Sequence, residues 1–247
     1  MKTKALKLTV TTVLASALAA CGGGGDSAST IAAEGIWGGT TSGGTLTALI
    51  VLEDGETWGA YGNDNVSSPA AGVLQGQLST SGNAVSGSLR DVSLLGSEPS
   101  NVSISGTTVP KSSLNLLLGG TTTLNMTYDA SYDTPASLAT MAGTYTGTAL
   151  SSDGIDEGST VVLTQGGAIS TSSATATGCT GSGSVALRNS SKAVVNFSIT
   201  FSGTGCLFPP GTVIQGVAQV TGGDLVVIGL DGSKTQGLLF TSDDNPS

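Results

Sequence analysis

The same series of short motifs occurs twice in this chain of 247 residues, in the same order and at nearly constant spacing. GIWGGT at residues 35–40 matches GTYTGT at residues 143–148, which begins 108 residues later. VSISG at residues 102–106 is similar to VIQG at residues 213–216. Because both order and spacing are kept, the sequence predicts one structural unit that is used twice. We place the boundary between the copies near residue 138, in a proline-containing segment.

Each copy contains about eight short runs with the pattern of β-strands. In VNFSITF at residues 195–201 every second residue is apolar, as expected for a strand that buries one face. Turn dipeptides such as Asp54-Gly55 and Asp231-Gly232 separate the runs. The expected strands are residues 35–41, 45–53, 57–62, 72–79, 84–93, 101–109, 113–119 and 122–128 in the first copy, and residues 142–149, 159–164, 168–174, 179–187, 193–202, 212–220, 224–230 and 236–241 in the second.

Eight short antiparallel strands in roughly 100 residues are typical of a small closed barrel. Closure would also protect the sheet edges of a chain that has few lysines. The sequence therefore predicts an all-β fold with two tandem small antiparallel β-domains, each an eight-stranded up-and-down barrel, and two β-sandwiches are the alternative. Two nearly continuous apolar runs, at residues 46–52 and 225–228, are expected to be buried on both faces.

Each copy opens on a glycine that is followed two residues later by an aromatic residue, Trp37 after Gly35 and Tyr145 after Gly143. This opening resembles the first strand of lipocalins and avidins, in which the aromatic side chain plugs one end of the barrel. The resemblance covers only these residues, and it implies barrels whose interior can bind a small ligand.

The first twenty residues have the three parts of a secretory signal peptide: three lysines, a short apolar stretch at residues 8–17, and small residues before Cys21. The apolar stretch is shorter than the roughly 20 residues that a membrane-spanning helix needs. LAAC at residues 18–21 resembles the lipobox of bacterial lipoproteins, in which the cysteine thiol receives a diacylglyceryl group and the chain is cleaved just before it. The resemblance implies that Cys21 is the lipid-bearing N-terminus of the mature protein.

A tether rich in glycine and serine is expected at residues 21–33. A cysteine followed by a glycine run is similar to the tethers of surface lipoproteins such as the transferrin-binding and factor-H-binding proteins. In lipoproteins an aspartate directly after the cysteine favours the inner membrane, so Gly22 at this position implies the outer membrane, on its periplasmic face or at the cell surface. The expected organisation is thus a signal peptide (1–20), the tether (21–33), a first β-domain (34–138) and a second (139–247).

Charged residues make up 10% of the chain, and the chain contains no histidine. The lack of histidine excludes Ser-His-Asp and Cys-His catalysis and histidine-ligated zinc or haem. Removal of residues 1–20 would change the formal net charge from −9 to −12, which disfavours nucleic acid as a partner. We expect no catalytic residues, no metal and no cofactor. The expected partners are the membrane, through the lipid on Cys21, and an unidentified protein.

Two cysteines remain, Cys179 and Cys206, and we expect them to form a disulfide in the oxidising cell envelope. Closing a loop of this size would stabilise the fold by roughly 3–4 kcal/mol through restriction of the unfolded chain. The bond would join the open end of the hairpin formed by the fourth and fifth strands of the second copy to the loop that follows.

Two acidic segments are candidates for chemistry. DGIDEG at residues 153–158 offers three carboxylates for a cation such as Ca²⁺, but it lacks the spacing of a calcium loop, so a solvated hairpin tip is expected. EDGE at residues 53–56 could supply paired carboxylates for glycoside hydrolysis. Adjacent acids on a hairpin tip are expected to face solvent without converging. Trp37, Trp58, Tyr61 and Tyr128 could line one apolar pocket, although core or barrel-end positions are the stronger expectation.

Three functional hypotheses follow. The leading one is a membrane-anchored, non-catalytic lipoprotein with a structural, adhesive or protein-binding role at the cell envelope. The alternative is the binding of a small apolar ligand inside a barrel, which requires a cavity of roughly 300 Å³ or more lined by apolar groups. The third is a hydrolase that uses only carboxylates, which requires two acids that converge in a cleft.

Overall fold

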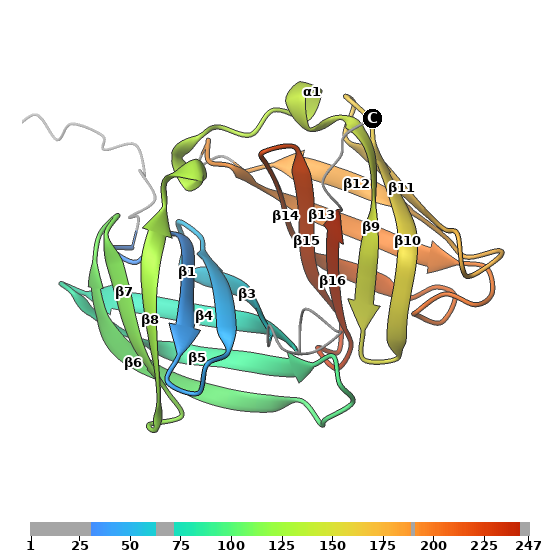
Figure 1. The fold of residues 1–247 in the computed structure, drawn as a ribbon. Coiled ribbons are helices and arrows are strands. Elements are labelled where there is room, and N and C mark those ends of the chain that lie inside the picture. The colour runs from blue at the N-terminus through green and yellow to red at the C-terminus, as the bar shows by residue number, and fades with distance from the viewer. Residues whose placement is uncertain (1–30, 63–71, 189–190, 243–247) are drawn as a thin grey trace, which may run out of the picture.

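The structure, a computed structural model, describes residues 31–62, 72–188 and 191–242. The expected signal peptide, Cys21 and the tether up to residue 30 lie outside the described residues. The chain forms two closed antiparallel barrels that follow each other along the sequence (Figure 1). Within the described ranges, no helix is both long enough and apolar enough to cross a membrane.

The first barrel consists of β1 (Gly35–Thr41), β2 (Leu46–Val51), β3 (Glu56–Gly62), β4 (Gly72–Ser81), β5 (Ala84–Ser93), β6 (Ser100–Val109), β7 (Ser113–Leu118) and β8 (Thr122–Asp129). The second consists of β9 (Gly143–Ser151), β10 (Gly154–Leu163), β11 (Ala168–Ser173), β12 (Thr180–Leu187), β13 (Val194–Ser202), β14 (Val213–Thr221), β15 (Asp224–Asp231) and β16 (Gly237–Ser242). Between them lie η1 (Ala130–Asp133) and α1 (Leu138–Met141). Since β1 pairs with β8 and β16 pairs with β9, both sheets close, which confirms the predicted barrels over sandwiches.

Most strands lie within a few residues of their predicted positions, and β5 begins and ends where expected. The exception is β10, which begins at Gly154, whereas the expected strand began at residue 159. A β-bulge shifts the register between Glu157 and Ser159, and the strand continues on both sides of it. Gly158 within the bulge has a φ of +83°, which glycine adopts without strain. A glycine that indicated a turn in the sequence is therefore part of a strand.

One end of each barrel is closed by the aromatic residue of its opening motif. The Trp37 indole is fully buried, and its Nε1 donates to the carbonyl oxygen of Ala33 at 2.9 Å. The Tyr145 hydroxyl donates in the same way to the carbonyl oxygen of Met141 at 2.7 Å. In both cases the acceptor lies four residues before the aromatic residue. The two copies thus use the same plug, as their Gly-x-aromatic openings predicted. Ala33, expected to be part of the tether, packs inside the first barrel.

Glycines on the inner faces allow neighbouring strands to approach closely. Gly39 and Gly147 occupy the same place in the two opening motifs, and Gly106 and Gly216 are matched in the same way by the repeat. A Cβ atom on any of the four would overlap a backbone carbonyl oxygen of the adjacent strand. The duplication has therefore kept glycine where the closed sheet leaves no space for a side chain.

The two barrels pack against each other through their outer faces (Figure 1). The buried apolar cluster between them comprises Ile36, Ile50, Leu52, Trp58, Val73, Val92 and Leu94 of the first half, Leu150, Val194, Val217, Ile228, Leu230 and Leu239 of the second, and Tyr132 of η1. This explains the apolar runs at residues 46–52 and 225–228, because one face lines a barrel and the other meets the second barrel. Leu46 and Ala48 are exposed, so the first run is buried on both faces only from Leu49 onward.

A single carboxylate of the connecting segment contacts both barrels. Asp133 accepts a hydrogen bond from Lys111 of the first barrel and another from Lys192 of the second, each at 2.7 Å. Tyr128 donates a third at 3.0 Å. The two ammonium groups, with Lys111 the larger contributor, hold the pKa of Asp133 well below its usual range. The carboxylate therefore stays ionised and joined to both barrels down to acidic pH.

The barrels lie side by side with the same orientation. Both β1 and β9 run away from the end that holds η1 and α1, so both plugged ends lie at the top of Figure 1 and both open ends at the bottom. The first described residues also lie at the plugged end, where the backbone N–H of Ala32 donates to Thr80 of β4 at 3.1 Å. The described part of the chain thus begins at the end opposite the barrel mouths.

Candidate ligand site

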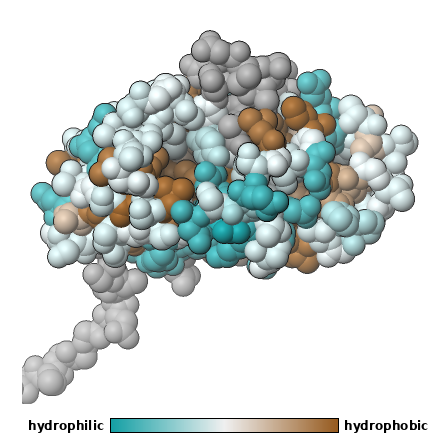
Figure 2. Space-filling model, turned by 90° about the horizontal axis from the view of Figure 1, so that it is seen from below, coloured by the Kyte–Doolittle hydropathy of each residue, from teal (hydrophilic) through white to brown (hydrophobic). Residues whose placement is uncertain are grey.

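The first barrel contains a cavity of about 410 Å³ that opens at the mouth. It is lined by Thr41, Gly43, Thr45, Thr47, Tyr61, Leu74, Leu89, Asp91, Val102, Ile104, Leu118 and Thr122. Leu74, Leu89 and Ile104 are buried, whereas the threonines at residues 45 and 122 are partly exposed near the opening. Figure 2 looks at the mouths from below, and hydrophobic residues lie in the hollow over the first barrel, on the left. The cavity therefore has apolar walls and a polar rim.

Besides the buried Thr47, two polar side chains interrupt the apolar wall. Tyr61 of β3 and Asp91 of β5 both point inward, and the tyrosine hydroxyl donates a hydrogen bond to Asp91 Oδ1 at 2.7 Å. Burial raises the pKa of Asp91 above its usual value, although the hydrogen bond from Tyr61 acts in the opposite direction. Burial, followed by the hydrogen bond to Asp91, also raises the pKa of Tyr61. The pair is thus a phenol donor and a poorly solvated carboxyl at the edge of an apolar space.

The interior of the second barrel is filled. All four phenylalanines of the chain lie in the second half. Phe197, Phe201 and Phe240 point into the barrel, and the cavity left between them measures about 50 Å³. Phe208, in the loop after β13, covers the mouth and packs on Phe201 with a distance of 4.9 Å between ring centroids. The duplicated fold therefore has two closed sheets, of which the first encloses an open cavity and the second has a filled interior.

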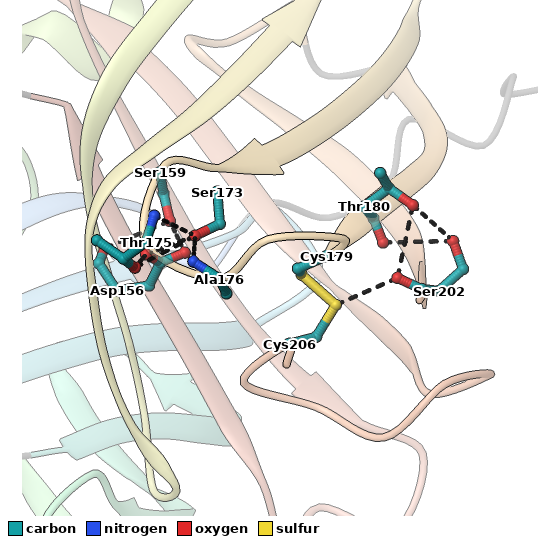
Figure 3. The surroundings of a disulfide bond; sticks show 9 residues. All are labelled: Asp156, Ser159, Ser173, Thr175, Ala176, Cys179, Thr180, Ser202 and Cys206. Atoms are coloured by element: carbon teal, nitrogen blue, oxygen red, sulfur yellow. Dashed lines mark hydrogen bonds between the residues drawn. A yellow bond between two sulfur atoms is a disulfide. The ribbon is translucent and has the colours of Figure 1, made fainter. Parts of the chain in front are cut away.

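The predicted disulfide is present between Cys179, just before β12, and Cys206, in the loop after β13 (Figure 3). It fastens the loop that carries Phe208 over the mouth of the second barrel. The bond thus joins the open end of the β12–β13 hairpin to the following loop, as the sequence predicted, and it also keeps this barrel closed.

The expectation of a solvated hairpin tip at residues 153–158 is wrong for its central acid. Asp156 is 7% exposed and lies inside the second barrel, because β10 continues through this segment. Its carboxylate accepts hydrogen bonds from Ser159 at 2.7 Å, from Ser173 at 2.8 Å, and from Thr175 (Figure 3). Three hydroxyl donors satisfy this buried acid, which makes it a structural group of the barrel. In the described part of the chain, no group of three potential ligands is arranged for a metal ion.

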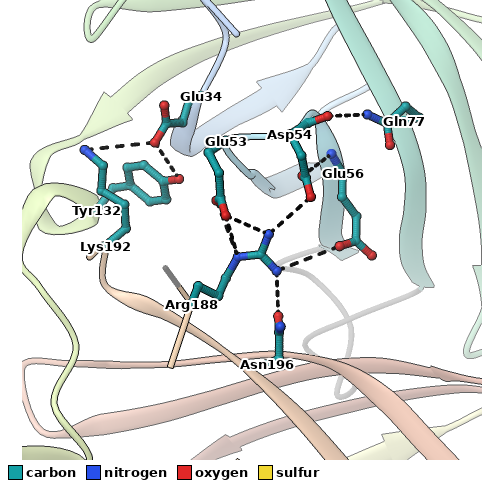
Figure 4. A network of polar contacts seen from close by, with 9 residues as sticks. All are labelled: Glu34, Glu53, Asp54, Glu56, Gln77, Tyr132, Arg188, Lys192 and Asn196. Carbon is teal, nitrogen blue, oxygen red and sulfur yellow. Dashed lines mark hydrogen bonds and ion pairs between the residues drawn. The ribbon is translucent and has the colours of Figure 1, made fainter. Parts of the chain in front are cut away.

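The acids at residues 53–56 were expected to face solvent without converging; Asp54 does face solvent, with 57% of its side chain exposed, but the expectation that the acids do not converge is wrong. Arg188, from the end of β12, reaches across to the first barrel and binds Glu53 at 3.0 Å and Asp54 at 3.4 Å (Figure 4). Glu56 lies 4.0 Å from the same guanidinium group, and Asn196 accepts a hydrogen bond from it at 2.6 Å. The three acids therefore converge on a cation that joins the barrels.

The four aromatic residues of the first copy do not line one pocket. Trp37 and Tyr128 pack edge to face at 5.3 Å in the plugged end. Trp58 lies on the outer face between the barrels, and its indole N–H has no hydrogen-bond partner among the described residues. Only Tyr61 lines the cavity. Asp91 was missed by the sequence reasoning, although a signal existed. In β5 it follows Val85, Gly87 and Leu89 at intervals of two, so it is an acid on the inward face.

No family model matches the chain, and no curated protein matches it either. Among solved structures, it is similar to a protein of unknown function of the DUF3598 family from Nostoc punctiforme. The two chains share 10% sequence identity with a TM-score of 0.30, over 86% of this chain and 96% of the other. A likeness at this level supports no statement about fold or function.

Proposed function

We propose that this protein is a lipid-anchored, non-catalytic protein of the outer membrane whose first barrel binds a small apolar ligand. The proposed ligand binding is based on one observation: the first barrel contains a cavity of about 410 Å³ with buried leucine and isoleucine walls. Ligand pockets typically measure roughly 300–1,000 Å³ and are mostly apolar, with a few polar groups that orient the ligand. The cavity fits this description, with Tyr61, Asp91 and the threonine hydroxyls as its polar groups.

Comparison with the second barrel also supports ligand binding by the first barrel. It has the same strand order and the same aromatic plug, but its phenylalanines and the loop over its mouth leave about 50 Å³. A barrel of this kind therefore does not need a cavity, because the second barrel of the same chain has a filled interior. A structural or adhesive role has no comparable observation in its favour among the described residues and stays an expectation from the sequence.

Ligand binding in the cavity can be tested with a variant whose larger side chain fills the cavity. Val102 of β6 lines the cavity, and the next residue, Ser103, is exposed on the outer face. We expect Val102→Trp to weaken the binding of a neutral apolar probe such as decanol at least about 10-fold, because the indole occupies the space that the ligand needs. Ser103→Trp adds the same side chain outside and should leave binding unchanged. Calorimetric titration of the Cys21→Ser chain, which needs no detergent, measures both.

Two outcomes of this titration would contradict ligand binding in the first barrel. One is the absence of any saturable binding of decanol to the protein with an intact cavity. The other is equal affinity of Val102→Trp and Ser103→Trp, which would place the bound probe elsewhere.

The anchor is tested at Cys21. We expect the wild-type protein to enter the detergent phase on Triton X-114 partitioning and the Cys21→Ser variant to remain in the aqueous phase, because the acyl chains supply the membrane affinity. Ser27→Ala, which changes the tether and leaves the cysteine, is the control. Gly22→Asp should move the protein from the outer-membrane to the inner-membrane fraction of a density gradient. Identical partitioning of wild type and Cys21→Ser would refute the lipid anchor.

A further inference from the structure

Among the described residues, the carboxylate in the cavity of the first barrel has a single hydrogen-bonding partner. Asp91 is partly buried, and the Tyr61 hydroxyl donates to it at 2.7 Å. Of the residues that the structure describes, no lysine or arginine lines the cavity and none forms a salt bridge with Asp91. The contrast with Asp156 of the second barrel is direct, because three hydroxyl groups donate to that buried carboxylate.

An acid in this position destabilises the unliganded protein. Removing a carboxylate from water without a nearby cation is unfavourable, and the pKa of Asp91 is raised for this reason. A leucine or asparagine on the inward face would avoid the penalty. Ionisable groups that are desolvated inside a cavity are typical of binding sites, where the ligand supplies the missing partner.

The polar atoms at the cavity also define which head group fits. The Tyr61 hydrogen is directed at Asp91, so the phenol oxygen can only accept a further hydrogen bond, and the carboxylate can only accept. A head group that lies against this pair must therefore bring donors, and the Asp91 carboxylate would repel a carboxylate or phosphate there; the threonine hydroxyls that also line the cavity can accept as well as donate. We infer that the ligand is a small amphipathic amine, with an apolar body against Leu74, Leu89 and Ile104 and a protonated amino group against Asp91. This inference rests on the proposed function of the first barrel.

Three probes of equal chain length distinguish the contribution of the head group to the affinity from that of the apolar chain: decylamine, decanol and decanoate. We expect the Cys21→Ser chain to bind decylamine at least about 10-fold more tightly than decanol, because a charge-assisted hydrogen bond is added. Decanoate should bind most weakly. Asp91→Asn should reduce the affinity for decylamine to that for decanol and leave decanol unchanged. Glu98→Gln removes an exposed acid near the same mouth and controls for long-range attraction of the cationic probe.

The same titration distinguishes the inference from the function on which it rests. Two results would refute the amine ligand and leave the proposed apolar site intact. In one, decanol binds and decylamine binds no more tightly than decanol. In the other, Asp91→Asn and Glu98→Gln reduce the affinity for decylamine equally. If none of the three probes binds, the proposed function itself fails. Thermal unfolding of Asp91→Asn shows whether the variant is folded. We expect it to be at least as stable as the parent at neutral pH, because an uncompensated charge has been removed from the cavity.

Discussion

Replacing Gly39 with alanine is expected to lower the free energy of unfolding by about 3 kcal/mol, near the upper end of the usual range for overpacked interiors. Gly39 faces the inside of β1, and a Cβ atom there would overlap the carbonyl oxygen of Asn125 and lie 2.9 Å from Met126 Cα. Both atoms belong to the backbone of β8, so no rotamer change can relieve the overlap. Since β1–β8 pairing closes the first barrel, relief requires the seam of the barrel to open.

The neighbouring residue supplies the control. A Cβ atom on Gly38, on the outer face of the same strand, would meet nothing within 4 Å. Gly38→Ala should therefore be neutral or stabilising by up to about 0.5 kcal/mol, because alanine has less conformational freedom to lose on folding. Urea denaturation followed by tryptophan fluorescence reports on both variants, since both tryptophans lie in the first barrel. Equal stabilities of Gly38→Ala and Gly39→Ala would contradict the close approach of β1 and β8.

The second large effect is expected at the contact between the barrels. Arg188→Ala should lower the free energy of unfolding by about 2–3 kcal/mol, somewhat less than for a fully buried ion pair. The Arg188 side chain is 9% exposed, and its guanidinium group binds Glu53, whose side chain is 17% exposed, with Asp54 and Glu56 close by. Removing it leaves three carboxylates near one another without their cation. Urea denaturation of the variant and the parent at neutral pH measures the loss.

Lys111 provides a matched cation for comparison. It binds Asp133 at 2.7 Å, but its side chain is 61% exposed, and Asp133 keeps Lys192 when Lys111 is removed. Lys111→Ala should therefore cost no more than about 0.5 kcal/mol, as is usual for exposed ion pairs. A loss for Arg188→Ala that does not exceed the loss for Lys111→Ala would show that the guanidinium group contributes little to the packing of the barrels.

The filled second barrel supports the first barrel through their contact. Its outer face supplies six of the fourteen residues of the apolar cluster between the barrels, and Arg188 supplies the cation that binds the acids at residues 53–56. Its interior is packed with phenylalanine, and its mouth is covered by a loop that the disulfide holds. A packed barrel can stabilise the open one, which has fewer interior contacts because it encloses a cavity.

The strand pattern was predictable because alternation and turn residues are local properties. Turn dipeptides and apolar alternation placed β5 correctly at both ends. The disulfide was predictable because only two cysteines remained after Cys21. The start of β10 was not, since a bulge glycine and a turn glycine look the same in a sequence. Asp91 could have been found from its place on the inward face of β5, but alternation alone does not show whether that face lines a filled or an open barrel.

By itself, the sequence determined the repeated unit, its strands, the closing aromatic residues Trp37 and Tyr145, and the cysteine pair. Each of these depends on the order of residues within one short segment or on their number. Only the tertiary structure decided that Glu53 binds Arg188, that Asp156 is buried, and that one barrel is open while the other is filled. These facts depend on residues far apart in the chain and on the volumes of side chains that meet inside a closed sheet, and neither can be derived from a local pattern.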